Sequence, residues 1–129
     1  ALTRLRDVMK ETRDCGFDRL RDAQQELGRK VRALLEARGI PSVAADGFKA
    51  PGVVVSYTDD PEIQSARRFI AEGLQTAAGV PLQCDEGPGF STFRIGLFGL
   101  EKLNNVERTV SHLAAAFDRI GLKATQAAA

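Results

Sequence analysis

The residue with the clearest chemical potential is Arg94, which lies inside the apolar segment S-T-F-R-I-G-L-F-G at positions 91 to 99. A guanidinium group can make two parallel, charge-assisted hydrogen bonds to a carboxylate or a phosphate. A partly desolvated charge without a counter-ion costs roughly several kcal/mol, so an arginine in such a segment needs an anion nearby. The segment therefore indicates anion capture, with the anion supplied by the protein or by a ligand.

Alternation along the segment predicts where Arg94 points. Side chains of a strand alternate between its two faces, which places Phe93, Ile95 and Leu97 on one face and Arg94 and Gly96 on the other. The three large apolar residues identify the core face. We therefore expect Arg94 to face away from the core, with open space beside it at Gly96. The residues alone favour a different explanation, a structural ion pair with one of the 17 acidic residues, and the spacing does not overturn it.

Other chemistry-bearing residues give weaker signals. His112 is expected on the outer face of a helix with no second His or Cys near it, which speaks against a metal or general-base role. Cys84 has no evident His partner, and Lys49 lies in a loop where solvation is expected. The loop 85–89, D-E-G-P-G, carries two acids that would repel phosphate, so we interpret it as a connection. No complete catalytic constellation is recognisable.

Length and composition narrow the class of protein. The chain has 129 residues with 43% apolar content, which is typical of one globular domain. Its 18 basic and 17 acidic residues give a net charge of +1, which argues against nucleic-acid and membrane-surface partners. Neither a spanning segment nor a signal peptide is recognisable, so a cytoplasmic location is the default expectation. Cys15 and Cys84 are interpreted as free thiols.

The first 40 residues predict two amphipathic helices. The first has Leu2, Leu5, Val8 and Met9 at helical spacing and ends at Gly16. The second is long, ends near 39–41, and has a face of mixed charges that is expected to be solvated. Its apolar stripe comprises Phe17, Leu20, Leu27, Val31, Leu34 and Leu35.

The region 41–122 predicts a small α+β domain. The β-branched segment 53–57 is expected as an interior strand. Asp59 or Asp60 is expected to cap a helix that runs to Gly79. Brief extended segments are expected at 80–84 and 92–98. The predicted stripe of that helix is Ile63, Ala66, Phe69, Ile70, Leu74 and Ala77.

The last helix and the overall architecture complete the prediction. Asn104 and Glu107 are expected to form a capping box, and Gly121 to end the helix. The inward residues are Val106, Val110, Leu113, Phe117 and Ile120. We predict an α+β two-layer sandwich, a small and mostly antiparallel sheet with helices on one face. A helical segment 1–40 would precede the domain 41–122, and a frayed tail 123–129 would follow it.

Residues 92–99, T-F-R-I-G-L-F-G, resemble the F-R-I-G-x-x-G signature near the C-terminus of class V, fold type I, pyridoxal-phosphate aminotransferases. The alanine/serine–glyoxylate aminotransferase group is the most similar. Residues 5–39 resemble the helix, glycine and long helix that lead out of the large domain of these enzymes. Residues 50–57, the helix to Gly79 and the final helix from Asn104 resemble the small C-terminal domain. The chain also starts without Met inside a helical pattern, so we expect a piece of a longer chain.

The resemblance implies a role for Arg94 and also implies that this chain lacks the residues that hold the cofactor. It implies that Arg94 binds the α-carboxylate of an amino-acid substrate and that the substrate occupies the space at Gly96. The cofactor lysine and the aspartate that pairs with the pyridine nitrogen lie in the large domain of the family. No lysine here has the family's Schiff-base context, so we expect the fragment to be inactive and to bind no cofactor by itself. The lysines are Lys10, Lys30, Lys49, Lys102 and Lys123.

The implied parent is a homodimeric enzyme that performs ping-pong transamination between a small amino acid and a 2-oxo acid. Which amino donor it uses stays open. A fragment of it would be a monomer, or would associate through the apolar stripes of its first two helices. Two rival hypotheses remain: a regulatory module in which Arg94 binds a small carboxylate without catalysis, and an interaction domain that uses the helix 17–38 as its surface.

Overall fold

The structure, a computed structural model, describes residues 1–123. Except for Lys123, the predicted frayed tail lies outside the described residues. No helix in this part of the chain is both long and apolar enough to cross a membrane. The elements are α1 (Leu2–Cys15), α2 (Phe17–Glu36), β1 (Val53–Tyr57), α3 (Pro61–Gln64), α4 (Arg67–Ala71), β2 (Ala77–Ala78), β3 (Thr92–Gly96), α5 (Leu100–Asn104) and α6 (Val106–Ile120).

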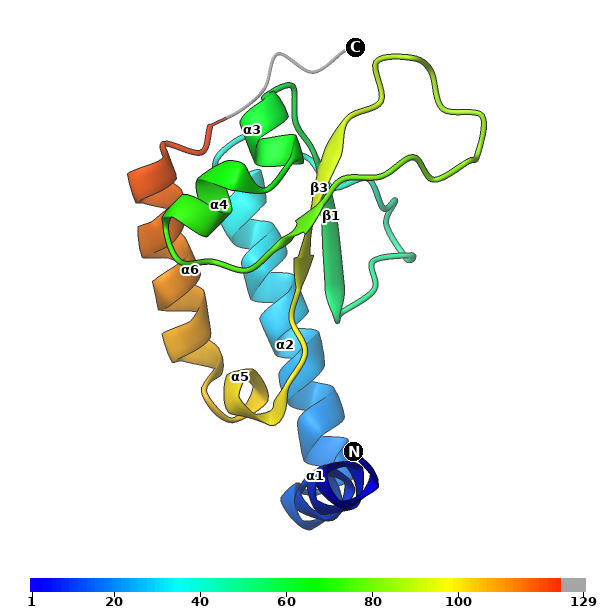
Figure 1. Cartoon of the computed structure of the whole chain (residues 1–129), viewed down its shortest axis with the longest axis vertical. Helices are drawn as coiled ribbons and strands as arrows, with labels where there is room; N and C mark the ends of the chain where they lie inside the picture. The colour runs from blue at the N-terminus through cyan, green and yellow to red at the C-terminus, as the bar shows by residue number, and fades with distance from the viewer. Residues whose placement is uncertain (124–129) are drawn as a thin grey trace.

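The strands form a three-stranded antiparallel sheet in the order β1-β3-β2. Helices α2, α3, α4 and α6 lie on one side of it, which confirms the predicted α+β class (Figure 1). The prediction that 53–57 is an interior strand is wrong, because β1 is an edge strand. Its outer edge is nevertheless partly paired: Tyr57 N–H donates to the Pro41 carbonyl at 3.2 Å, and Val43 N–H donates to the Val55 carbonyl at 3.0 Å. Residues 41–43 thus cover part of the edge that β1 would otherwise expose.

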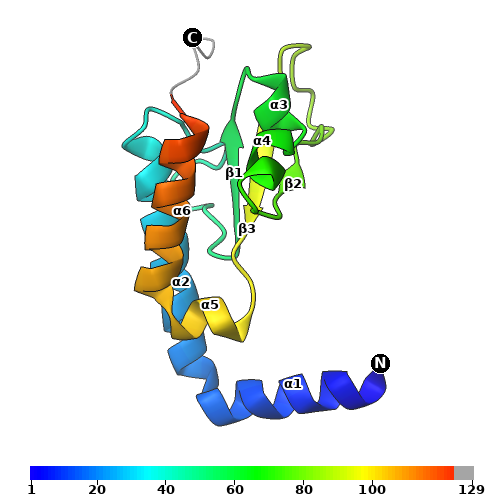
Figure 2. The same cartoon turned by 60° about the vertical axis from the view of Figure 1, so that its left-hand side comes forward.

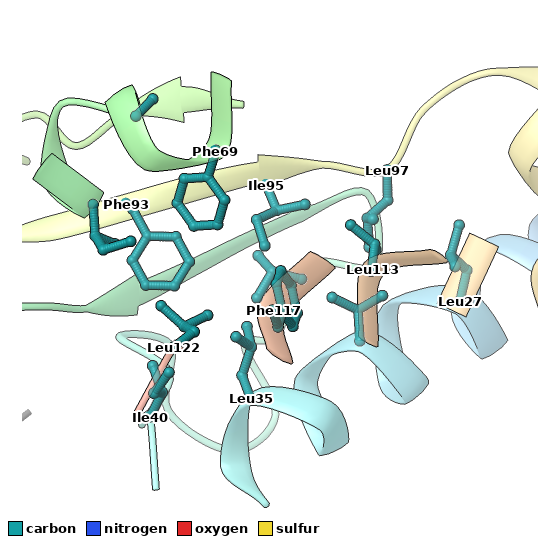
Figure 3. Close-up of a cluster of buried hydrophobic side chains, with 14 residues drawn as sticks. Leu27, Leu35, Ile40, Phe69, Phe93, Ile95, Leu97, Leu113, Phe117 and Leu122 are labelled. Atoms are coloured by element: carbon teal, nitrogen blue, oxygen red, sulfur yellow. The ribbon is translucent and has the colours of Figure 1, made fainter. Parts of the chain in front are cut away.

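The core lies between the sheet and the helices (Figure 3). At its centre, the Phe69 ring packs 5.4 Å from that of Phe93 and 6.4 Å from that of Phe117, between centroids. Leu27 and Leu35 of α2 are buried in the same cluster. The long helix therefore shares one core with the sheet, and its predicted inward stripe is confirmed except at Phe17, which is 67% exposed. This stripe is consequently not available for association.

The first helix behaves differently from the second. The chain turns at Gly16, whose φ of 89° favours glycine, and α1 points away from the other elements (Figure 2). No residue of α1 is buried. The predicted helix and its end at Gly16 are confirmed, but its apolar stripe is left exposed by residues 1–123.

The prediction of a single helix that runs to Gly79 is wrong. Two short helices, α3 and α4, lie between β1 and β2 instead. Asp60 caps the start as predicted, accepting from the N–H groups of Glu62 at 2.8 Å and Ile63 at 3.4 Å. Ala66 then adopts a left-handed φ of 66°, which separates α3 from α4. Ile70 is 63% exposed, and residues 77–78 form β2 instead of the predicted strand at 80–84.

The start of the last helix also differs from the prediction. Asn104 and Glu107 do not form a capping box: the side-chain oxygen Oδ1 of Asn104 accepts from Arg19 Nη2 at 2.6 Å, and Glu107 pairs with Lys30. Both contacts link α2 to this region, so tertiary partners outcompete the local motif. The short α5 was not predicted. Gly121 ends α6 with a φ of 67°, as expected, and the inward stripe of α6 packs on the core.

Candidate functional site

The central strand β3 presents its side chains as the alternation predicts. Phe93, Ile95 and Leu97 are 0%, 3% and 1% exposed and face the helices. Arg94 lies between Val55 of β1 and Ala77 of β2 and is partly buried. Because neighbouring residues of a strand point to opposite faces, Arg94 projects from the face that carries no helices.

The guanidinium of Arg94 is held by the backbone of the neighbouring strand. Its Nε donates to the Ala78 carbonyl oxygen at 2.9 Å. No carboxylate in residues 1–123 lies within ion-pair distance of Arg94, and no hydrogen bond from its Nη1 or Nη2 to this part of the chain is found. The structural ion pair considered above therefore has no partner there. The bond at Nε fixes the orientation of the group while its two terminal nitrogens remain available for an anion.

Gly96 is exposed at the end of the same strand. A Cβ atom there would lie 3.7 Å from Cδ2 of Phe98, an ordinary contact distance, so Phe98 forms one wall of the space that was expected to be open. Gly96 also lines a hollow of about 440 Å³ between β3 and α6, but Arg94 is not among its lining residues. The structure thus places Arg94 and Gly96 on one strand without bringing them into a common cavity.

The loop before β3 is folded around one of its own carboxylates. Glu86 accepts from the backbone N–H groups of Cys84 at 2.6 Å and of Gln83 at 2.8 Å, and from that of Leu82. These donors, that of Cys84 foremost, lower the pKa of Glu86. The amide groups that could have cradled an external anion are therefore occupied, in keeping with the interpretation of this loop as a connection.

The remaining weak candidates are not brought into a cluster. His112 and Cys84 are both exposed, and Cys84 lies in the loop described above. No group of three or more potential metal-ligating residues occurs within the described part of the chain.

The lysines do not fit a covalent site for pyridoxal phosphate. A Schiff-base lysine needs an amine whose pKa is depressed. Lys49 pairs with Asp46 at 2.8 Å and with Glu36 at 3.5 Å, and the hydrogen bond to Asp46 raises its pKa. Lys30 pairs with Glu26 and Glu107, and Lys102 donates to the Phe98 carbonyl oxygen at 2.9 Å. Lys10 lies on the uncovered α1 and Lys123 at the end of the described chain.

A second arginine was missed by the sequence reasoning. Arg32 of α2 is only 6% exposed, although its helix face was expected to be solvated. A signal was present: Arg32 follows Gly28 by four residues and lies between Val31 and Leu35, at the border of the apolar stripe. Its surroundings are described below.

The fold is that of a small α+β domain found within larger aminotransferase chains. No family model and no curated protein sequence matches this chain. Among solved structures it is similar to an alanine–glyoxylate aminotransferase from Nostoc sp., with a TM-score of 0.60 and 18% identity over 77% of this chain. It is also similar to the ureidoglycine–glyoxylate aminotransferase of Bacillus subtilis, with a TM-score of 0.63 and 19% identity over 91% of this chain. The matches span only 25% and 30% of those two chains.

Proposed function

We propose that this chain is the C-terminal small domain of a class V, fold type I, pyridoxal-phosphate-dependent aminotransferase, in which Arg94 binds the α-carboxylate of the substrate. One observation carries the proposal. Arg94 lies on the central strand of a fold shared with two glyoxylate aminotransferases, and neither of its terminal nitrogens has a partner in residues 1–123. The cofactor lysine would belong to another part of the parent protein, because the lysines of this chain do not fit that role.

The proposed contribution of Arg94 is binding and orientation. Its Nε is anchored on Ala78, so an incoming carboxylate would meet Nη1 and Nη2 without reorganisation of the side chain. A carboxylate held at two oxygens has a fixed plane, which sets the direction of the bonds at the adjacent Cα atom. The domain thus supplies substrate alignment and no acid–base group.

The test uses the intact parent protein with its cofactor and measures the apparent dissociation constant of L-alanine, L-serine and glyoxylate in single-turnover half-reactions. Replacing the bidentate fork, Arg94→Lys, should weaken binding of the amino donor by about tenfold to a hundredfold, the range for a charge-assisted hydrogen bond. The cofactor absorbance before substrate addition should stay unchanged. Arg68→Lys is the matched control, because Arg68 pairs with Asp60 at 3.1 Å and Glu62 at 3.3 Å, away from Arg94.

Donor binding that is equal in Arg94→Lys and in the wild type would refute the role of Arg94. Saturable carboxylate binding at Arg94 in a parent that lacks transaminase activity would favour the regulatory module instead. The homodimeric state of the parent and its cytoplasmic location are further parts of the proposal, and sedimentation and cell fractionation of the parent test them.

A further inference from the structure

Among residues 1–123, Arg32 is a nearly buried charge that forms no ion pair. Its Nη2 donates to two backbone carbonyl oxygens, those of Ala50 at 2.6 Å and Val53 at 3.0 Å. Its Nε is enclosed and has no hydrogen-bond partner, and no carboxylate of residues 1–123 is within ion-pair distance. Neutral carbonyl groups compensate a buried cation only in part.

Arg32 lines a hollow of about 290 Å³ between α2 and the segment that leads into β1. Arg29, which lies three residues before Arg32 on the same side of α2, lines it as well. Gln25 and Lys49 are also in its wall. Arg29 has no ion pair among the described residues. The hollow therefore gathers three cationic side chains from two segments that are distant in the sequence.

Glu36 is the one acidic side chain in the wall of this hollow. Its carboxylate lies 3.5 Å from Lys49, which also pairs with Asp46 at 2.8 Å. These two acids thus pair with Lys49, and no ion pair joins either of them to Arg29 or Arg32. Burial lowers the pKa of Arg32, and Glu36 only partly opposes this effect. An anion in the hollow would reduce the penalty that burial imposes on Arg32.

We infer that the hollow between α2 and residues 49–51 is a binding site for a small oxyanion, a phosphate or carboxylate group held by Arg29 and Arg32. This site is distinct from Arg94, which lies on β3 and does not line the hollow. Arginine suits both kinds of group, because its planar fork matches two oxygens of either. The hollow, at about 290 Å³, has room for a phosphate or carboxylate group and for part of the ligand to which that group is attached.

The experiment titrates the 129-residue chain with inorganic phosphate and, separately, with acetate, at constant ionic strength maintained with sodium chloride. Thermal unfolding and isothermal calorimetry report binding, since a ligand of the folded state raises Tm in a saturable manner. Tighter binding of phosphate identifies a phosphate-type site, and tighter binding of acetate a carboxylate-type site. Absence of saturable binding by both anions overturns the inference.

Variants locate the bound anion. Arg29→Gln at the rim of the hollow should weaken binding by about two- to fivefold, the range for a partly exposed charge. Glu36→Gln should tighten it, because a like charge is removed from the wall. Arg32→Gln should abolish anion binding. If Arg32→Gln does not fold, the weaker binding expected of Arg29→Gln still tests the site. Arg21→Gln, on the same helix but paired with Asp18 and Asp22, is the control and should bind normally.

Two results would contradict the site. Equal weakening in Arg21→Gln and Arg29→Gln would mean unspecific charge screening. Weakening in Arg94→Gln with normal binding in Arg29→Gln would place the anion at Arg94, which would support the proposed function and exclude this second site. Conversely, loss of donor binding in the Arg94 variants says nothing against the hollow, so the two proposals fail independently.

Discussion

Helices α1 and α2 both have an amphipathic sequence pattern, but the apolar face of α2 is buried and that of α1 is exposed. In α2, Leu27 and Val31 are fully buried against the sheet and α6. In α1, Leu2 and Leu5 occupy an equivalent stripe but are 81% and 57% exposed. A 3.6-residue period indicates that a helix has an apolar face, but it does not indicate whether the same chain covers that face.

The two helices should differ most in how much stability is lost when a leucine of the apolar face is replaced by alanine. Leu27→Ala should reduce the free energy of unfolding by about 2–5 kcal/mol, because it removes buried methyl groups and leaves a cavity. Leu5→Ala in α1 should change it by less than about 0.5 kcal/mol, as exposed substitutions do. Urea titration of this chain measures both. Comparable losses in the two variants would mean that α1 packs on the domain in solution.

A smaller effect is expected at the closest backbone contact of α2. A Cβ atom on Gly28 would lie 2.5 Å from the carbonyl oxygen of Pro51, so Gly28→Ala forces the two segments apart. The expected net destabilisation is about 0–2 kcal/mol, an overpacking cost of about 1–3 kcal/mol less about 1 kcal/mol gained in helix propensity.

Glu11→Ala on the uncovered α1 is the control for this variant, and the same urea titration should place it within about 0.5 kcal/mol of the wild type. If Gly28→Ala were instead stabilising, the approach of α2 to Pro51 would be looser in solution than in the structure.

The smallest effect concerns the charges that flank the buried face of α2. The hydrogen bond from Lys30, together with its charge, lowers the pKa of Glu26, and Lys30 also pairs with Glu107 of α6. A carboxyl whose pKa is lower in the folded state contributes stability above its unfolded-state pKa and loses it as the pH falls through the folded-state value. Glu26→Gln should therefore be less stable than the wild type near neutral pH, and the difference should vanish on acidification below the ordinary range for Glu.

The measurement is the urea midpoint of both proteins between pH 7 and pH 3. Glu11→Gln in α1 serves as the matched control, because Glu11 has no ion pair among residues 1–123. A difference between wild type and Glu26→Gln that persists unchanged at the acidic end would show that the pair with Lys30 is not its source.

Parts of the fold were predictable because their causes are local. The cap at Asp60, the strand 53–57, the turn at Gly16 and the end of α6 at Gly121 follow from residues adjacent in the sequence. The break at Ala66 has no such signal, because a left-handed alanine is tolerated only when surrounding contacts enforce it.

Strand β2 consists of two alanines, a composition that favours no strand. Its position is set by long-range contacts: Ala77 pairs with Arg94, and a Cβ on the neighbouring Gly79 would lie only 1.7 Å from the Thr92 carbonyl oxygen. Such contacts between segments distant in sequence cannot be recognised from a local pattern.

The same distinction between local and long-range causes applies to Arg94 and Arg32. The sequence by itself determined that Arg94 projects from the face opposite Phe93 and Ile95, because alternation is a property of any strand. Only the tertiary structure decided that Arg32 is buried without an ion pair among residues 1–123, because this depends on how residues 49–53 pack against α2. The covering of α2 and the exposure of α1 were likewise decided by packing, since the period of a helix does not specify what lies beside it.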